Sequence, residues 1–296
     1  MSLNVRKGGP QILSRVVDRI QDSAIDLCGF QEIRASTVGN WRTSLEGAGY
    51  TVTDTLALAR EHGIPHPSAM REDGLLIASR WPLRALKPNR IQIAWPERLL
   101  SVVVKHPDGA FEFHTTHVPN GSLGEKLYYR KAPAAGRDRL EKKIDTLEAI
   151  FRALTRSKLM PRVLAGDFNE PFSESSDGAV HYWQHKCPAL LRPMLEERWR
   201  NAAYSVFRGL AAHGMKDAFR TKHGYGKPAH SWETNPRQDD DGIPVKEPNL
   251  YRLDHLFVST DFSIEACDYD HSFRATGLSD HAAVFADLYD DDVKIR

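Results

Sequence analysis

The chain has 296 residues, of which 41% are hydrophobic and 27% are charged, and its formal net charge is +1 at pH 7. A chain of this length and hydrophobicity can bury a large core and can still form one domain. A net charge so close to zero excludes a strongly basic protein that coats nucleic acid without regard to sequence, although it permits a local basic groove.

Membrane and secreted disulfide-rich proteins are not expected either. No apolar run is long enough to span a bilayer, and the first residues lack the pattern of a secretory signal peptide. The cysteines Cys28, Cys187 and Cys267 are isolated and odd in number, which predicts neither a disulfide framework nor a zinc cluster. We therefore expect a protein of a reducing compartment, the cytoplasm, without a membrane partner or an obligate protein partner.

The first segments predict a helix and a strand. Only three residues precede Asn4, so any strand that leads to it is short or absent. Pro10 then opens a predicted helix, since proline is common at the first helical position. The apolar stripe of this helix consists of Ile12, Leu13, Val16, Val17 and Ile20. Residues 25–30 form a predicted buried strand that ends in Gln31-Glu32, and Glu32 alone would indicate little, because a glutamate after a strand is common.

A group of predicted strands follows in the next part of the chain. Residues 74–79 form one strand, and residues 99–104 and 110–116 form a hairpin around Pro107-Asp108-Gly109. His114 and His117 are three residues apart in extended chain, so their side chains point to opposite faces and make a poor metal pair. We expect His117, where the strand ends, to be available for chemistry and His114 to be structural.

Residues 122–143 form a predicted loop that enters a helix, and basic residues outnumber acidic ones along it. A basic stretch interleaved with Tyr128 and Tyr129 suits phosphate contact and base stacking. A solvated helix face is the alternative explanation for residues 139–143. The basic side chains that we predict to bind substrate are Lys126, Arg130 and Lys131.

The motif Gly166-Asp167-Phe168-Asn169 ends a short apolar run that predicts a buried strand. Because side chains alternate in extended chain, Asp167 and Asn169 should point the same way, with Phe168 turned into the core. A carboxylate beside a carboxamide can share one task, in which one takes a proton and the other donates hydrogen bonds or positions water. The alternative is an ordinary turn, since Gly, Asp, Asn and the following Pro171 are all turn residues.

Two more polar clusters lie on predicted strands towards the C-terminus. Residues 251–258 carry Asp254 within an otherwise apolar strand, where a buried carboxylate without a partner would cost several kcal/mol. Ser279-Asp280-His281 precedes another apolar strand. Before them we predict a helical insertion over about 173–230, within a single domain of residues 1–296.

Taken together, these motifs resemble the endonuclease/exonuclease/phosphatase superfamily, which has the fold of pancreatic deoxyribonuclease and of apurinic/apyrimidinic endonucleases. The resemblance runs from Asn4 to about Leu288. It rests on Asn4-Val5-Arg6, Gln31-Glu32, Gly166-Asp167-Phe168-Asn169, Arg252-Leu253-Asp254 and Ser279-Asp280-His281. The fold that it implies is an α/β, four-layered sandwich, in which two mixed sheets pack face to face with helices outside.

The resemblance also implies metal-dependent hydrolysis of a phosphoester. Glu32 and Asp280 would hold Mg²⁺ or Mn²⁺ with Asn4 close by, and such oxygen ligands suit a hard cation. Asp167 would orient or deprotonate the attacking water.

Four further residues take roles from the same resemblance. Asn169 and Asn120 would bind the phosphate oxygens. His281 would stabilise the charge of the pentacoordinate phosphorus, and a hydrogen bond that Asp254 accepts would fix the tautomer of His281.

The motifs divide between two branches of the superfamily. His117 stands where the deoxyribonuclease branch has histidine and apurinic endonucleases typically have tyrosine. In the deoxyribonuclease branch a carboxylate supports this histidine, and Glu72 and Asp73 are both candidates for that role here. Tyr251 stands where apurinic endonucleases place an aromatic side chain that lines the lesion pocket. Arg6 resembles the deoxyribonuclease branch.

We therefore predict a metal-dependent phosphodiesterase, a DNA endonuclease or exonuclease that contacts DNA through Tyr251 and the basic loop. The same superfamily hydrolyses inositol phosphates, sphingomyelin and RNA tails, so a phosphatase or phosphodiesterase of a small or lipid phosphoester is an alternative. A second alternative is a scaffold that keeps the fold without turnover. The intact set of charged motif residues argues against it, since a decayed site loses a charged residue first.

Overall fold

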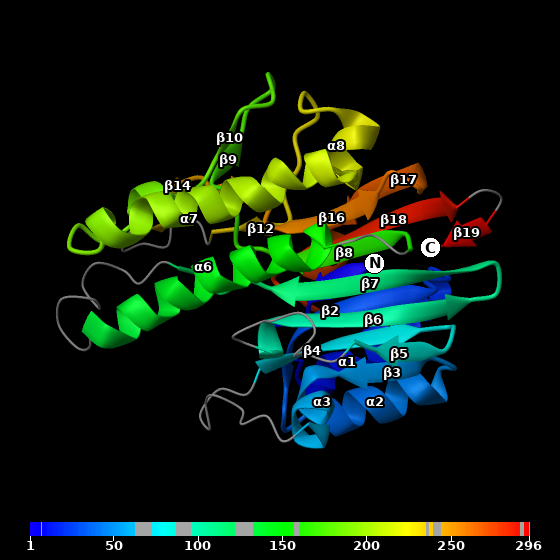
Figure 1. Ribbon diagram of the computed structural model, residues 1–296. Helices are drawn as coiled ribbons and strands as arrows, with labels where there is room; N and C mark the ends of the chain where they lie inside the picture. The colour runs from blue at the N-terminus through cyan, green and yellow to red at the C-terminus, as the bar shows by residue number, and fades with distance from the viewer. Residues whose placement is uncertain are drawn as a thin grey trace.

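The computed structural model describes residues 1–6, 8–62, 73–86, 96–121, 133–156, 160–234, 237–238, 244–290 and 293–295. Within these residues the strands form one seven-stranded sheet, one six-stranded sheet and three two-stranded ribbons (Figure 1). The helices lie outside the two sheets, which confirms the predicted four-layered α/β sandwich. No helix in this part of the chain combines the length and the apolar character needed to cross a membrane.

The first sheet has the strand order β17-β18-β1-β2-β4-β3, and β19 also pairs with β18. β1 runs parallel to β2 and antiparallel to β18. The strands of this sheet are β1 (Ser2–Asn4), β2 (Leu27–Arg34), β3 (Thr51–Asp54), β4 (Asp73–Ser79), β17 (Ser263–Asp270), β18 (Ala283–Asp290) and β19 (Val293–Ile295). The strand that leads to Asn4 is therefore present but only three residues long.

The second sheet has the strand order β11-β16-β8-β7-β6-β5. β8 runs parallel to β7 and antiparallel to β16. Its strands are β5 (Leu83–Ala85), β6 (Leu99–His106), β7 (Gly109–His117), β8 (Arg162–Asp167), β11 (Met215–Asp217) and β16 (Asp254–Ser259). The predicted hairpin is confirmed as β6–β7, in which His106 pairs with Gly109 across a two-residue turn.

The helices and short elements complete the layers. The α-helices are α1 (Pro10–Asp22), α2 (Val38–Gly47), α3 (Thr55–Glu61), α6 (Pro133–Thr155), α7 (Arg192–Phe207), α8 (Ala218–His223) and α9 (Ser272–Ala275). The 3₁₀ turns are η1 (Pro96–Arg98), η2 (Trp183–Lys186) and η3 (Gly209–His213). The ribbons pair β9 (Ser173–Glu174) with β10 (Val180–His181), β12 (Trp232–Glu233) with β15 (Leu250–Tyr251), and β13 (Arg237–Gln238) with β14 (Pro244–Lys246).

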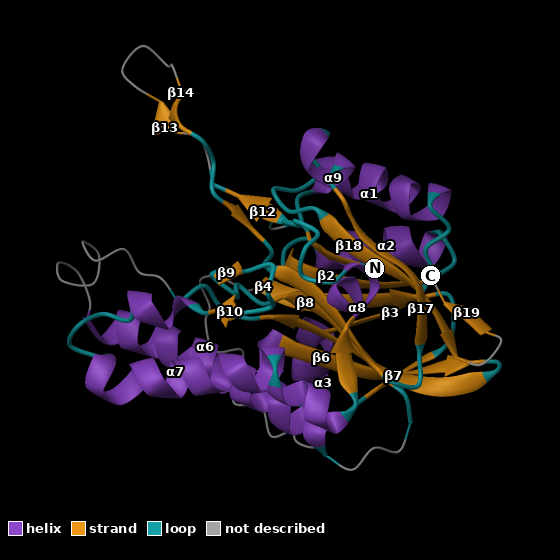
Figure 2. Ribbon diagram, turned by 90° about the horizontal axis from the view of Figure 1, so that it is seen from above, coloured by secondary structure: helices purple, strands orange, loops and turns teal. Residues whose placement is uncertain are grey.

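Hydrophobic side chains fill the three spaces between the four layers. Between the sheets, β4 contributes Leu75 and Ile77, and β8 contributes Val163. The alternate side chains point outward: Leu76 packs in the cluster that includes α1 and α2, and Leu164 in the cluster that includes α6 and α7. Figure 2 shows these helix pairs on opposite sides of the strands. Because both faces of each central strand are covered, successive residues are apolar.

At two glycines the backbone lies unusually close to a neighbouring strand or to the facing sheet. A Cβ atom added at Gly166 would lie 2.2 Å from the carbonyl oxygen of Thr116 on the neighbouring strand. A Cβ atom added at Gly29 would lie 2.6 Å from Oγ1 of Thr115 on the facing sheet. The side chain of Gln31 donates hydrogen bonds to Thr115 Oγ1 at 2.8 Å and to Ser2 Oγ at 3.0 Å. Gln31 thus joins the two sheets.

Two predicted strands have different bounds in the structure. The strand predicted over 25–30 continues to Arg34 through a bulge between Phe30 and Ile33, so Glu32 lies within β2. The strand predicted over 251–258 is interrupted, because Ser231 Oγ accepts hydrogen bonds from the N–H groups of Leu253 and Asp254. These N–H groups therefore do not donate to a neighbouring strand at the start of β16.

The segment 173–230, predicted as a helical insertion, contains η2, α7, η3 and α8. It also contains β11, which pairs with β16 and forms an edge of the second sheet. A buried ionic cluster connects the segment to the C-terminal motifs. In it, Arg252 contacts Glu174 at 2.6 Å and Asp217 at 2.7 Å, and Arg220 contacts Glu174 at 2.8 Å.

Candidate active site at the common edge of the two sheets

The strand directions bring the polar motifs to one edge of the sandwich. In the first sheet the end of β1 lies beside β2 and near the start of β18, which places Asn4, Glu32 and His281 together. In the second sheet the ends of β7 and β8 lie beside the start of β16. His117 pairs with Asp167 there, and Asp167 pairs with Asp254. Each sheet therefore supplies half of the predicted site.

The two halves meet at Asp167, His281 and Asp254, all of which are buried. Nδ1 of His281 lies 2.7 Å from Oδ2 of Asp254, and Nε2 of His281 lies 4.0 Å from Oδ2 of Asp167. Burial alone would lower the pKa of His281, but the Asp254 carboxylate raises it to about 10. Burial and the charge of Asp254 raise the pKa of Asp167. His281 is therefore positively charged at neutral pH and faces a carboxylate that takes up a proton readily.

Asn4 connects the carboxylates of the two sheets. Its Nδ2 donates to Oδ2 of Asp167 at 3.0 Å and to Oε1 of Glu32 at 3.4 Å. Its Oδ1 accepts a hydrogen bond from the N–H of Arg6 at 3.0 Å. Ser279 Oγ donates to the Asn4 carbonyl oxygen and accepts from the N–H of His281. The first and last motifs are thereby fixed to each other.

Asn169 adopts a left-handed backbone conformation, with φ of 49°, directly after β8. This turn, rather than strand alternation, places it beside Asp167, and Phe168 is buried as predicted. The N–H of Asn169 donates to Oδ1 of Asp167 at 2.9 Å, and its Nδ2 donates to the Val118 carbonyl oxygen at 2.9 Å. The buried Lys143 donates to the Asn169 carbonyl oxygen at 2.9 Å. Lys143 was not among the predicted site residues.

Left-handed backbone is concentrated at this site. The non-glycine residues with positive φ in the described chain are Arg6, Ala24, Glu32 and Asn169. Arg6, Glu32 and Asn169 each contact a site residue or belong to the site. Such conformations cost about 1–3 kcal/mol each and persist where the surrounding structure imposes them, which is typical of active sites.

The carboxylates on the side of the first sheet fit a hard divalent cation. Burial raises the pKa of Glu32, and the nearby charges of Asp73 and Asp280 raise it further. Such crowding of acidic groups is relieved by a cation with oxygen ligands. Asp280 also lies 3.6 Å from Nε of Arg6. In addition, Asp167, Asp254 and His281 each offer a ligand atom within 4.8 Å of the others, although Asp254 and His281 are already bonded to each other.

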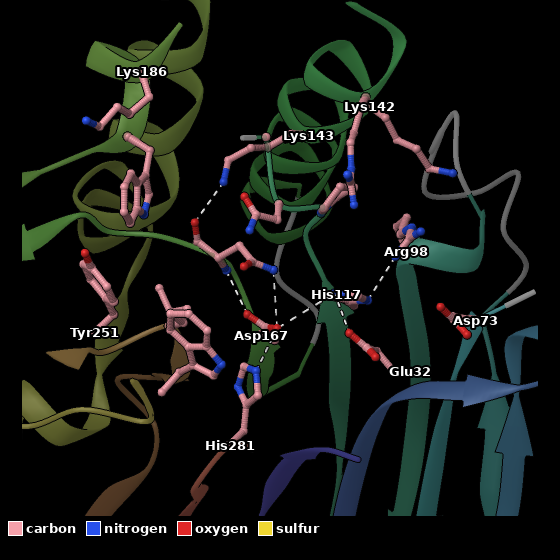
Figure 3. Close-up of a pocket in the computed structure, with 18 of the residues that line it drawn as sticks. Glu32, Asp73, Arg98, His117, Lys142, Lys143, Asp167, Lys186, Tyr251 and His281 are labelled. Atoms are coloured by element: carbon pink, nitrogen blue, oxygen red, sulfur yellow. Dashed lines mark hydrogen bonds and ion pairs between the residues drawn. The ribbon is translucent and has the colours of Figure 1, made fainter. Parts of the chain in front are cut away.

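His117 lies at the end of β7 between Arg98 and the carboxylates (Figure 3). Its Nδ1 is 3.0 Å from Nη1 of Arg98, and its Nε2 is 3.8 Å from both Glu32 Oε1 and Asp167 Oδ2. Burial and the charge of Arg98 hold the pKa of His117 well below its ordinary value. Of the two carboxylates that are candidates to support this ring, Asp73 contacts Arg34 at 3.8 Å instead. Glu72 lies outside the described residues.

His114 is structural, as predicted from its position in the strand. It is fully buried, and its Nδ1 lies 2.7 Å from Ser101 Oγ on β6. Its Nε2 lies 3.3 Å from Oε2 of Glu112. These contacts place His114 on the opposite side of β7 from His117.

The site opens into a cleft of about 960 Å³. Figure 3 shows Arg98, Lys142 and Asp73 on one side of Asp167, and Tyr251 and Lys186 on the other. The aromatic side is formed by Trp183, Trp232 and Tyr251, with ring centroids 5.3 Å apart for Trp183–Tyr251 and 6.1 Å apart for Trp232–Tyr251. Of the predicted substrate contacts, Tyr251 and Asn120 line this cleft. Lys126, Arg130 and Lys131 lie outside the described residues.

Sequence reasoning missed Arg98, Lys143 and Trp183. Arg98 could have been found from the predicted hairpin, because the register that pairs Leu99 with Thr116 sets Arg98 opposite His117. Lys143 and Trp183 carry no comparable signal. Both reach the cleft through elements whose position depends on long-range packing, α6 and η2.

Comparison with known proteins supports the fold and the family. The sequence model of the Endonuclease/Exonuclease/phosphatase family matches residues 1–281 of the chain. Among curated proteins, no sequence matches the chain significantly.

Several solved structures are similar over nearly the whole chain. An AP endonuclease from Archaeoglobus fulgidus is 17% identical, with a TM-score of 0.62 and 96% of each chain covered. TDP2 from D. rerio, complexed with a single-strand DNA product, is 12% identical, with a TM-score of 0.61 and 97% of each chain covered. The 3′ phosphatase NExo from Neisseria, bound to a product DNA hairpin, is 17% identical, with a TM-score of 0.60. It covers 97% of this chain and 98% of its own. At these identities the likeness concerns the fold.

Proposed function

The chain belongs to the endonuclease/exonuclease/phosphatase family, and from this premise we propose that it is a divalent-metal-dependent phosphodiesterase that acts on DNA. The observation that carries the proposal is the contact between the halves of the site. The charged His281, held by Asp254 at 2.7 Å, faces the carboxylate of Asp167 at the floor of a cleft. A cation and a proton acceptor set 4.0 Å apart suit the hydrolysis of an anionic ester.

Asp167 is the residue that we assign to the attacking water. Its raised pKa makes the carboxylate a proton acceptor near neutral pH, which is the range in which a general base is effective. Water attacks phosphorus, its proton passes to the carboxylate, and the bond to the leaving oxygen breaks. Asn4 and Asn169 hold the carboxylate through hydrogen bonds to different oxygens. They therefore fix the direction from which water approaches.

The positive charges of the site act on the phosphate. His281 remains charged because of Asp254, and its Nε2 points towards the side of Asp167 where the ester binds in this proposal. It stabilises the negative charge that grows on the phosphoryl oxygens. Asn120 lines the cleft and is assigned to the same oxygens. For Asn169 a direct phosphate contact stays a prediction, since its Nδ2 donates to Val118 and lies 3.4 Å from Asp167.

Glu32, Asp280 and Asn4 are the residues that we assign to Mg²⁺ or Mn²⁺. Burial raises the pKa of Glu32, and the charge of neighbouring carboxylates raises it further, which supports this assignment. A bound cation of this kind supplies neutralisation of the phosphate and of the leaving oxygen.

The cleft favours a nucleic acid over a small phosphoester. Its aromatic side offers flat faces for unpaired bases, and stacking of this kind binds single strands without regard to sequence. Lys186 stands on the same side, where it can contact a backbone phosphate. Two of the similar structures hold DNA products, which is consistent with this choice.

One substrate panel tests the proposal. Activity should be measured with Mg²⁺ on plasmid DNA, an abasic duplex, single-stranded DNA, RNA and a small chromogenic phosphodiester. We expect turnover on at least one DNA and at least a hundredfold less with Asp167→Asn, the usual scale for a lost acid–base group. Turnover on the small ester alone would replace DNA with a small phosphoester as the substrate. No turnover on any substrate would leave the binding scaffold as the better explanation.

A further inference from the structure

The partner of His117 is a cation rather than a carboxylate. Nη1 of Arg98 lies 3.0 Å from Nδ1 of His117, and only 12% of the His117 side chain is exposed. An arginine has only N–H donors, so the ring nitrogen that faces it must accept the hydrogen bond. A nitrogen that accepts carries no proton, so the ring in this contact has at most one proton and is neutral. A neutral imidazole that accepts at Nδ1 carries its proton on Nε2.

The opposite nitrogen points into the site. Nε2 of His117 lies 3.8 Å from both Glu32 Oε1 and Asp167 Oδ2, and His117 lines the cleft. A carboxylate in the place of Arg98 would require a proton on Nδ1 and would leave Nε2 as an acceptor. The identity of residue 98 therefore decides whether the ring donates or accepts towards a bound ester.

Several contacts hold Arg98 in place, so its contact with His117 does not depend on one freely rotating surface side chain. Its carbonyl oxygen accepts a hydrogen bond from Thr116 Oγ1 at 2.7 Å, next to His117 in the chain. Its Nε lies 3.7 Å from Oε1 of Glu97, which is itself bonded to Lys142. Only 16% of the Arg98 side chain is exposed. The hydrogen bond from Thr116 thus fixes the backbone of Arg98, and the ion pair with Glu97 holds its guanidinium.

We propose that Arg98 is a positioning residue that fixes His117 as the Nε2–H tautomer, so that the ring donates a hydrogen bond to a phosphoryl oxygen in the cleft. The bound ester in this statement rests on the proposed function, whereas the tautomer does not. His117 then acts as a neutral donor beside the charged His281, and the two histidines have different tasks. Arg98 acts only through His117 and is not itself assigned to the substrate.

Long-range ¹H–¹⁵N spectra of the imidazoles test the tautomer directly at neutral pH, with His117→Gln used to assign the signals. In the parent protein we expect Nε2 of His117 to be protonated and Nδ1 to be unprotonated. Arg98→Met should shift the ring towards the other tautomer, and Arg98→Lys, which also offers only donors, should restore the parent pattern. Arg34→Met, which removes another cleft cation, should leave it unchanged. A proton on Nδ1 in the parent, or no change in Arg98→Met, overturns the proposal.

Kinetics on the best substrate of the panel give a second readout. Arg98→Met should lower kcat about tenfold, the effect of one weakened transition-state hydrogen bond of about 1.4 kcal/mol. It should have no further effect in a His117→Gln background, because both changes remove the same interaction. Additive losses would show that Arg98 acts independently of His117 and would overturn its role. If the protein hydrolyses none of the substrates, the proposed function fails. The tautomer of His117 in the parent protein can still be measured, so the role of Arg98 is tested separately.

Discussion

Asp254 begins β16 of the second sheet and His281 precedes β18 of the first, yet Oδ2 of Asp254 lies 2.7 Å from Nδ1 of His281. The partner that a buried carboxylate requires is thus supplied across the interface between the sheets. The same pair holds the imidazolium against Asp167. The first prediction follows from this pair.

Asp254→Asn and His281→Ala should each lower kcat at least about a hundredfold, since each removes the charge that faces the ester. The double variant should lose little more than either single variant, because the two residues act as a unit. Turnover on the best DNA substrate measures the effect. His271→Ala, a histidine that does not line the cleft, should keep parental turnover. A single variant with nearly parental kcat would contradict the assigned roles.

Removal of divalent cations should abolish turnover reversibly, and Mg²⁺ should raise the melting temperature of the parent protein. The second effect arises because a ligand that binds only the folded state stabilises it by mass action. Glu32→Gln should reduce the Mg²⁺-dependent shift, whereas Glu197→Gln, on the exposed face of α7, should not. An unchanged shift in Glu32→Gln would remove Glu32 from the cation site. The shift needs no substrate, so it tests the site separately from turnover.

Tyr251→Ala should weaken the binding of single-stranded DNA about fivefold to a hundredfold. This range corresponds to the loss of about 1–3 kcal/mol for one stacked base. Tyr204→Ala is a matched control, because Tyr204 is exposed on α7 away from the cleft. Fluorescence anisotropy at one fixed salt concentration gives the dissociation constants. Equal affinities for the two variants would mean that the aromatic side of the cleft does not hold bases.

Gly166→Ala should destabilise the fold by about 1–3 kcal/mol, because the new methyl group would overpack the backbone of Thr116. The neighbouring Asp167 would move with the strand, so turnover should also fall. Gly39→Ala is the control: its Cβ would meet nothing within 4 Å on an exposed helix, where alanine is favoured over glycine. Urea unfolding of both variants measures the difference. Equal stability of the two would show that the strands can separate locally at no cost.

Acid should weaken the fold through Glu112, which contacts Arg156 at 2.6 Å and Arg162 at 3.0 Å. Burial alone would raise the pKa of Glu112, but His114 and Arg156 lower it to about 2. The folded pKa is below the unfolded value of about 4.3, so the contribution is complete above pH 4.3 and is lost as the pH falls towards 2.

The variant Glu112→Gln tests whether the stabilisation by Glu112 decreases as the pH falls. It should reduce the free energy of unfolding at pH 7 by about 3 kcal/mol, the scale for a buried ion pair that loses one partner. At pH 3 the difference from the parent should be smaller. Glu46→Gln, which removes an exposed pair with Arg42, should change the free energy by less than about 1 kcal/mol at both pH values. A difference for Glu112→Gln that grows in acid would contradict the assignment.

Local patterns predict the strands and the polar residues beside them, whereas the four layers and the roles of the site residues follow from the resemblance to the family. An apolar strand that ends in polar residues locates Asp167, an apolar strand that follows polar residues locates Asp280, and the burial argument alone requires a partner for Asp254. The break in the strand after Tyr251 is not visible locally. It depends on Ser231, twenty-two residues before Leu253, and on an ionic contact between Arg252 and Glu174 across 78 positions.

The partner of His117 shows the opposite case, in which the information was present in the sequence. Once the turn at residues 107–108 is recognised, antiparallel pairing sets Arg98 opposite His117. The resemblance to a family instead directs attention to a carboxylate from a neighbouring segment. Strand register was the stronger guide here, because it states which residues must be neighbours.

The division of the site between two sheets also determines when it can exist during synthesis. Asn4 and Glu32 leave the ribosome well before His281 does. Chains are made at about 5–20 residues per second, and domains fold as units. Until His281 has emerged, the growing polypeptide lacks the imidazolium and the strand that follows it. The proposed nuclease therefore cannot act on nucleic acid near the ribosome before this strand has been made.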